Sequence, residues 1–180
     1  MLAKSILSTA LLLATALSAA AQGLTAVDIT MIDDPYEICA DREIDIYGPI
    51  PADAIPIQGG YSFDANSDAL HWVRAQIALA TSSDLEKREW ANIGIGMFAQ
   101  NWCTGQGSWF DNVEYGTHYV DHTNMFAVGI SYRGLRDNEH LDFSRLAGSD
   151  WCGKYVFSAG RLTPVGCFNC QAINCFELWN

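Results

Sequence analysis

Basic residues are scarce in this sequence. The 180 residues contain 10 Lys and Arg against 21 Asp and Glu, so the formal net charge at pH 7 is −11. An acidic surface is repelled by nucleic acid and by anionic lipid headgroups, which both carry dense negative charge. We therefore expect neither nucleic acid nor a membrane surface as a partner.

Motifs that identify common enzymes are missing. The chain has no Gly-X-Ser-X-Gly nucleophile elbow, no zincin motif and no phosphate-binding loop. It also has no Asn-X-Ser/Thr sequon, so ordinary N-glycosylation is not expected. These absences favour a protein that is not an enzyme, with no catalytic residue, cofactor or metal assigned from motifs.

Only the start of the chain contains a long apolar run. Within residues 1–21, Lys4 precedes an apolar stretch, and the small residues of "SAAAQ" follow it. This order is typical of a secretory signal peptide, with cleavage after Ala20 or Ala21. The alternative, a membrane-spanning helix, needs about 20 apolar residues, and this run is shorter. The expected location of the protein is therefore extracellular.

The cysteines all follow the predicted signal peptide. In an exported chain an even number of cysteines indicates disulfides, and six allow 15 pairings. We expect all six to pair, and Cys152 to pair with Cys167 across an intervening hairpin; the other partners stay open. The six are Cys39, Cys103, Cys152, Cys167, Cys170 and Cys175.

The "CFNC" stretch has the spacing of a redox or metal motif. A redox motif belongs at a strand–helix junction of a βαβ unit, which does not surround Cys167 and Cys170. With Cys175 the pair could supply three thiolates to zinc, but exported thiols usually oxidise. Structural disulfides are the expected state.

The remaining chain has two parts of different composition. Residues 22–88 are acidic and proline-rich, and contain one convincing helix in "NSDALHWVRAQIALA", where Leu70, Val73 and Ile77 recur at helical spacing. Residues 89–180 hold most of the aromatic residues and glycines and contain about six or seven short strands, separated by turn residues. The predicted fold is mainly β: a small β-sandwich or Greek-key domain with disulfides, preceded by a pro-segment with one short helix.

A dibasic pair lies at the junction of these two parts. Lys87 and Arg88 follow a polar stretch, and small polar loops are where proteases cut most readily. "DLEKREW" resembles the Lys-Arg junctions that kexin-type proteases cut in fungal α-factor and killer-toxin precursors. We therefore predict processing by a kexin-type protease, although a charged surface turn would give the same residues.

Several polar residues lie close together in the sequence, as catalytic or metal-binding groups often do. His118 and His122 are four residues apart in "HYVDH", and on a strand they would be about 13 Å apart, too far for one metal ion. Carboxylates cluster at Asp111 and Glu114 and again further along the chain. Paired carboxylates are typical of glycosidases, but surface acids are common in an acidic protein. The second cluster contains Asp137, Glu139 and Asp142.

Aromatic residues gather around two glycines in "NWCTGQGSWFDN". Exposed aromatic rings can stack on sugars or anchor a protein partner. A glycine-rich loop would expose Trp102, Trp109 and Phe110 in this way, whereas in a small β domain they would fill the core. The three residues are the candidate binding site.

The layout of a signal, an acidic pro-segment, a Lys-Arg junction and a compact β domain resembles small secreted cysteine-containing fungal proteins of the effector or killer-toxin kind. "SYRGLRDNEHLDFS" and "INCFELW" are similar to strand segments in that group. A weaker resemblance is to β/γ-crystallin-type domains, but their calcium-binding signature is missing, so calcium is not implied.

The leading hypothesis is a secreted, disulfide-stabilised, non-enzymatic effector or toxin that acts on another organism or a cell surface. Its partner would be an extracellular protein or polysaccharide. One alternative is a carbohydrate-binding module that uses Trp102 and Trp109. The other is a small acid hydrolase that uses the region from Asp137 to Asp142.

Overall fold

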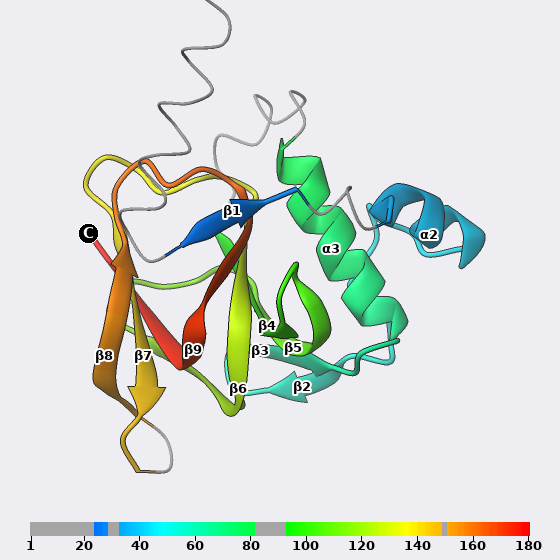
Figure 1. The fold of residues 1–180 in the computed structure, drawn as a ribbon. Helices are drawn as coiled ribbons and strands as arrows, with labels where there is room; N and C mark the ends of the chain where they lie inside the picture. Colours follow the sequence, from blue (N-terminus) through cyan, green and yellow to red (C-terminus); the bar gives the residue numbers. More distant parts are fainter. Residues whose placement is uncertain (1–23, 29–32, 82–92, 149–150) are drawn as a thin grey trace, which may run out of the picture.

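The described part of the protein is mainly β, as the sequence predicts. The computed structural model describes residues 24–28, 33–81, 93–148 and 151–180, which form nine strands of one antiparallel sheet and two helices (Figure 1). In chain order the elements are β1 (Thr25–Val27), α2 (Pro35–Asp41), β2 (Ile55–Ile57), β3 (Gly60–Phe63), α3 (Asp68–Thr81), β4 (Gly94–Gln100), β5 (Thr104–Phe110), β6 (His118–Ser131), β7 (His140–Leu146), β8 (Cys152–Ala159) and β9 (Gly166–Trp179). The predicted signal peptide and the Lys87-Arg88 pair lie outside the described residues.

The strands form a single sheet with the order β2-β3-β5-β4-β6-β9-β7-β8, and β1 pairs additionally with β9. Every pairing is antiparallel. This pairing does not divide the described strands into the two separate sheets of a sandwich.

The sheet curls so that its two ends enclose a core. The Phe110 ring of β5 lies 5.1 Å from Tyr119 of β6 and 5.4 Å from Phe176 of β9, measured between ring centroids. Since β4 separates β5 from β6, a flat sheet would hold these strands about 10 Å or more apart. The long strands β6 and β9 carry the bend, and their pairing shifts register between Val120 and Ala127. The core inside the curve also includes Ile95, Met97, Val128, Ile130, Phe143, Phe157 and Phe168.

Helix α3 covers part of the sheet and forms a second core with it (Figure 1). The hydroxyl of Ser67 caps the helix by accepting from the Leu70 amide at 3.0 Å, and the Asp53 carboxylate accepts from the first two helical amides. Val73 and Ile77 are fully buried, which confirms the apolar spacing that predicts the helix. On the sheet side, this core contains Phe63, Phe98, Trp109 and Ala127.

Segments before and after the dibasic pair belong to the same sheet. The β2–β3 hairpin pairs with β5, and β1 pairs with the start of β9. The second core joins the rings of Trp72 and Trp109, with centroids 6.3 Å apart. The expected boundary between residues 22–88 and 89–180 therefore separates elements that share one sheet and one core.

The disulfides differ from the prediction. Cys103 pairs with Cys167, and Cys152 pairs with Cys175, whereas Cys39 and Cys170 are free. Cys152 was expected to pair with Cys167 across a hairpin, but Cys167 lies at the start of β9, opposite β1. Cys175 lies further along β9, opposite Ser144 of β7, and β7 is the neighbour of β8, so Cys152 reaches Cys175 instead. The expectation that all six cysteines pair is therefore wrong in this structure.

The cysteine pairing gives a specific expectation for the processed protein. If a protease cuts after Arg88, we expect the two pieces to co-elute in size-exclusion chromatography under native conditions, because strand pairing and the second core hold them together. On a denaturing gel without reductant they should separate, since both disulfides lie in the later piece. The uncut Arg88→Ala variant is the control. Pieces that stay joined until a reductant is added would contradict the free state of Cys39.

Candidate functional site

A groove of about 620 Å³ lies between the β2–β3 hairpin, the start of β5 and the first half of β6. Its wall on the hairpin side is formed by Ile55, Ile57, Gln58, Ser62, Phe63 and Asp64, with Gln106 and Gly107 from β5. The opposite wall is formed by Thr117, His118, Val120, Asp121, His122, Thr123 and Met125.

Two glycines allow the hairpin to form one wall. A Cβ at Gly60 would lie 2.2 Å from the Trp109 carbonyl oxygen, and one at Gly107 would lie 2.2 Å from the Met97 carbonyl oxygen. Only glycine fits these contacts, so β3 and β5 pack closely against their neighbours at these points. At the turn of the hairpin, Gly59 has a φ of 78°, which disfavours other residues. The wall is therefore fixed by backbone packing.

Asp121 ties β6 to β5 beside the groove. Its carboxylate accepts a hydrogen bond from the buried hydroxyl of Ser108, and its Oδ1 accepts from the Thr123 amide at 2.7 Å. Because β4 separates β5 from β6 in the sheet, this contact depends on the curl. It holds the Asp121 carboxylate in one position on the groove wall.

The two histidines both line the groove, as expected for strand residues four apart. The Nε2 atom of His118 lies 3.1 Å from Glu177 Oε2 on β9. In the described part of the chain, no three His, Cys, Asp or Glu side chains are placed to hold one metal ion. The histidines are therefore polar groups of the groove wall.

A row of polar residues continues from His118 across the neighbouring strands. Cross-strand pairing aligns His118 with Glu177, Glu177 with Asp142, and Asp142 with Ser158. The Ser158 hydroxyl donates to Asp142, and His140 Nε2 lies 3.8 Å from the same carboxylate. Asp142 thus lies beside the carboxylate of Glu177, and glycoside hydrolysis requires such a pair of acids. Neither Asp142 nor Glu177 lines the groove.

Glu139 is separate from Asp142 and is buried. Its carboxylate accepts hydrogen bonds from Arg133 at 2.6 and 2.9 Å, from the Arg136 amide at 2.7 Å, and from the Tyr115 hydroxyl. Burial raises the pKa of Glu139, but the bonds from Arg133, Tyr115 and the Arg136 amide outweigh it and lower the pKa below its usual value. Asp137 instead lies exposed, 3.7 Å from Arg161. The three acids of this cluster therefore do not form one site, and Asp111 and Glu114 lie in an exposed loop outside the groove.

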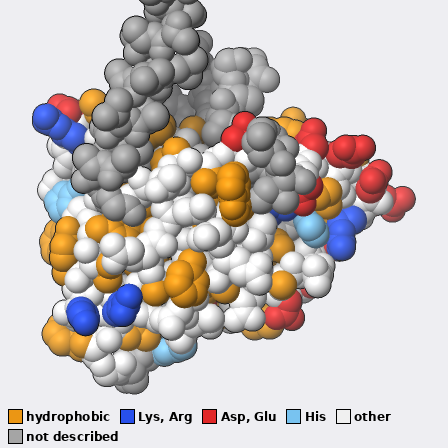
Figure 2. Space-filling view, viewed as in Figure 1, with side chains coloured by type: hydrophobic (Ala, Val, Ile, Leu, Met, Phe, Trp, Pro, Cys, Tyr) orange, Lys and Arg blue, Asp and Glu red, His pale blue; other side chains and the backbone are white. Residues whose placement is uncertain are grey.

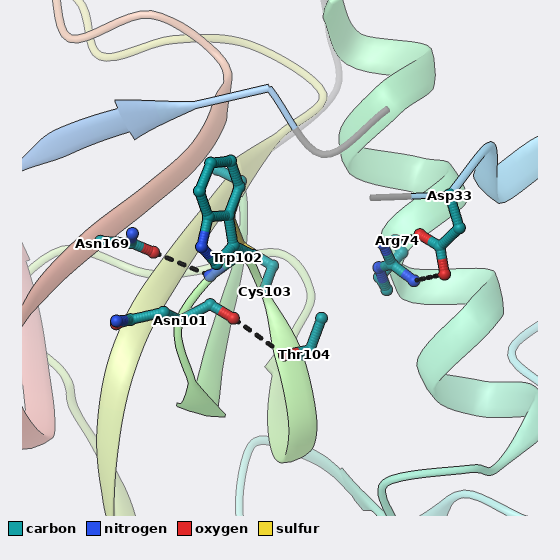
Figure 3. The surroundings of a disulfide bond; sticks show 8 residues. Asp33, Arg74, Asn101, Trp102, Cys103, Thr104 and Asn169 are labelled. Atoms are coloured by element: carbon teal, nitrogen blue, oxygen red, sulfur yellow. Dashed lines mark hydrogen bonds and ion pairs between the residues drawn. A yellow bond between two sulfur atoms is a disulfide. The ribbon is translucent and has the colours of Figure 1, made fainter. Parts of the chain in front are cut away.

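Two of the three aromatic residues expected to bind a ligand are buried. Trp109 and Phe110 are 1% and 0% exposed, because successive residues of β5 point into the second and the first core. Trp102 is 38% exposed in the β4–β5 turn, where its amide donates to Asn169 Oδ1 at 2.7 Å (Figure 3). Its φ of 67° is unusual for a bulky residue. The stretch that was expected to be a loop is mostly strand β5.

The groove was not predicted from the sequence, because no strand was expected before residue 89. The stretch "IPIQGGYSF" does contain a hairpin signal, since Gln58, Gly59 and Gly60 separate two short runs rich in apolar residues. Pro56 in the first run weakens the signal, although an edge strand such as β2 tolerates proline.

The two free thiols do not form a reactive site. Burial raises the pKa of Cys170 to about 12, and burial also raises the pKa of Cys39. A thiol with a raised pKa is rarely ionised and is a poor nucleophile. The Sγ of Cys39 instead donates to the His71 carbonyl oxygen at 3.5 Å.

No known protein family, curated protein or solved structure matches the chain. None of the helices in the described ranges is long and apolar enough to cross a membrane.

Proposed function

We propose that this chain is an exported, disulfide-stabilised, non-enzymatic protein that acts as an effector or toxin on another organism or a cell surface. It binds its target through the groove between the β2–β3 hairpin and β6. The signal-like residues 1–21 and the resemblance to secreted fungal proteins support export, as do the two disulfides.

The groove is the observation that carries this proposal. Its volume of about 620 Å³ is in the usual range for ligand sites, and its walls combine aliphatic and polar side chains. Close glycine packing at Gly60 and Gly107 and the Ser108–Asp121 bond hold the walls in place before a ligand arrives. A preformed site avoids the entropy cost of ordering on binding.

The groups that a hydrolase would need are engaged elsewhere, which supports binding over catalysis. Glu139 is held by Arg133, and Asp142 accepts from Ser158 outside the groove. Processing at Lys87-Arg88 by a kexin-type protease remains part of the proposal. The mature form would then consist of two pieces that stay together because their strands pair in one sheet.

Binding to intact cells tests the proposal. Fluorescently labelled protein is added to fungal, bacterial and plant cells, with a Gln106→Trp variant that places a large ring in the groove. We expect the wild type to bind at least one cell type and Gln106→Trp to lose about tenfold or more in affinity, because its ring occupies the ligand's volume.

The matched control is Gln171→Trp, since Gln171 is also an exposed strand glutamine but lies outside the groove. It should bind as the wild type does. Equal losses in both variants would contradict the groove as the contact site. Binding to chitin, cellulose or glucan that Trp102→Ala abolishes would instead favour the carbohydrate-binding alternative.

A further inference from the structure

We propose that the groove takes a basic segment of an extended polypeptide, with a lysine or arginine side chain beside Asp64 and Asp121. This inference rests on the proposed function, since it names the class of target that the groove binds.

The charge of the groove disfavours an anionic ligand. The described residues that line it include two carboxylates, Asp64 and Asp121, and no Lys or Arg. A third carboxylate, Glu177, lies next to the groove through its contact with His118. With a net charge of −11 for the whole chain, the groove attracts cations.

The groove also lacks the ring surface that sugars need. Phe63, the one Phe, Tyr or Trp among the described residues that line it, is 3% exposed and packs in the second core. The exposed apolar surface is aliphatic instead and includes Ile55 at the rim. Such a surface suits the methylene stem of a lysine or arginine, while the charged end reaches a carboxylate.

The shape of the groove favours a polypeptide over a small amine. On the β6 side its lining extends from Thr117 to Met125, about 26 Å along the chain at the rise of a strand. The other wall follows the β2–β3 hairpin, and β2 is an edge strand of the sheet. An extended segment of several residues can therefore lie along both walls.

Titration of the full chain with short peptides, followed by amide NMR, tests the inference. The probes are tetralysine, its fully acetylated form, tetraglutamate and the small polyamine spermine. We expect tetralysine to shift amides of residues 117–123 and 58–64, with an affinity that falls as salt is added. The acetylated peptide and tetraglutamate should not bind, and spermine should bind at least tenfold more weakly than tetralysine.

Two substitutions locate the contact. Asp64→Asn should weaken tetralysine binding several-fold without affecting the fold, because Asp64 is exposed. Asp121→Asn should add to the loss, since its amide oxygen can still accept from the Thr123 amide and its NH2 group can donate to the Ser108 hydroxyl, but the side chain carries no charge. The control is Asp137→Asn, an exposed acid outside the groove, which should bind as the wild type does.

Acidic side chains also gather around α2, which makes that region a rival site for a cationic peptide (Figure 2). Shifts confined to residues 35–45, equal binding of the acetylated peptide, or equal affinity for spermine would each overturn the inference. If the wild type binds tetralysine in the groove but binds none of the cell types, the result would contradict the proposed function and leave the inference about the groove standing.

Discussion

The double variant Cys103→Ser/Cys167→Ser is expected to lose about 4 kcal/mol of its free energy of unfolding. The two cysteines are separated by 64 residues, and a cross-link over a loop of this length removes about that much entropy from the unfolded chain. Both residues lie in the second core, so the substitutions also place hydroxyl groups among apolar side chains. Urea unfolding followed by tryptophan fluorescence measures the difference.

The control is Cys170→Ser, which removes a thiol that forms no disulfide. Its cost should be well below that of the double variant. A second check is alkylation of the unfolded protein without reductant, which should label two thiols, those of Cys39 and Cys170. Labelling of no thiol would contradict the disulfide pairing of the structure.

Substitution of the buried acid in Glu139→Gln is expected to destabilise the protein by about 3 kcal/mol at pH 7. The Arg133 side chain, 20% exposed, would lose the charge that compensates its own. Removing one partner of a buried ion pair typically costs about 3–5 kcal/mol, and glutamine retains part of the hydrogen bonding. The hydroxyl of Tyr115 would also lose a charged acceptor.

The effect should depend on pH with a definite sign. Since the pKa of Glu139 is lowered in the folded protein, the unfolded state takes up a proton first as the pH falls. The stabilisation from Glu139 is therefore complete above the unfolded pKa, about 4.3, and declines as the pH falls toward the folded pKa. The stability difference between wild type and Glu139→Gln should thus be larger at pH 7 than at pH 3.

Chemical unfolding of both proteins at the two pH values measures this difference. Asp137→Asn is the control, because Asp137 and Arg161 form an exposed pair, and such pairs contribute between about 0 and 1 kcal/mol. A difference that grows toward pH 3 would show that Glu139 is not held ionised by Arg133.

Elements with a strong internal pattern could be predicted from the sequence. Helix α3 follows from the spacing of Leu70, Val73 and Ile77 and from the Ser67 cap. Strands β4, β7 and β8 coincide with stretches of alternating or β-branched and aromatic residues. In each case the pattern reflects one buried face, so neighbouring residues suffice to recognise it.

Strands without a strong pattern of their own were missed. β1 and β2 have three residues each and exist because β9 and β3 pair with them. β5 has no clear strand pattern in the sequence, because glycines occupy positions where the neighbouring backbone approaches closely, as at Gly107. β6 has 14 residues, longer than the short strands predicted for this part of the chain, since a register irregularity bends the strand without ending it.

The sequence by itself determined the acidic charge, the mainly β composition and the long helix. All of these depend on residue type and on neighbours a few positions apart. Only the tertiary structure decided the cysteine pairing, the burial of Trp109 and the groove. These depend on the curl of the sheet, which brings β5 against β6 and places Cys152 beside Cys175. Contacts between residues far apart in the chain leave no periodic trace in it, so the site could not be predicted from spacing.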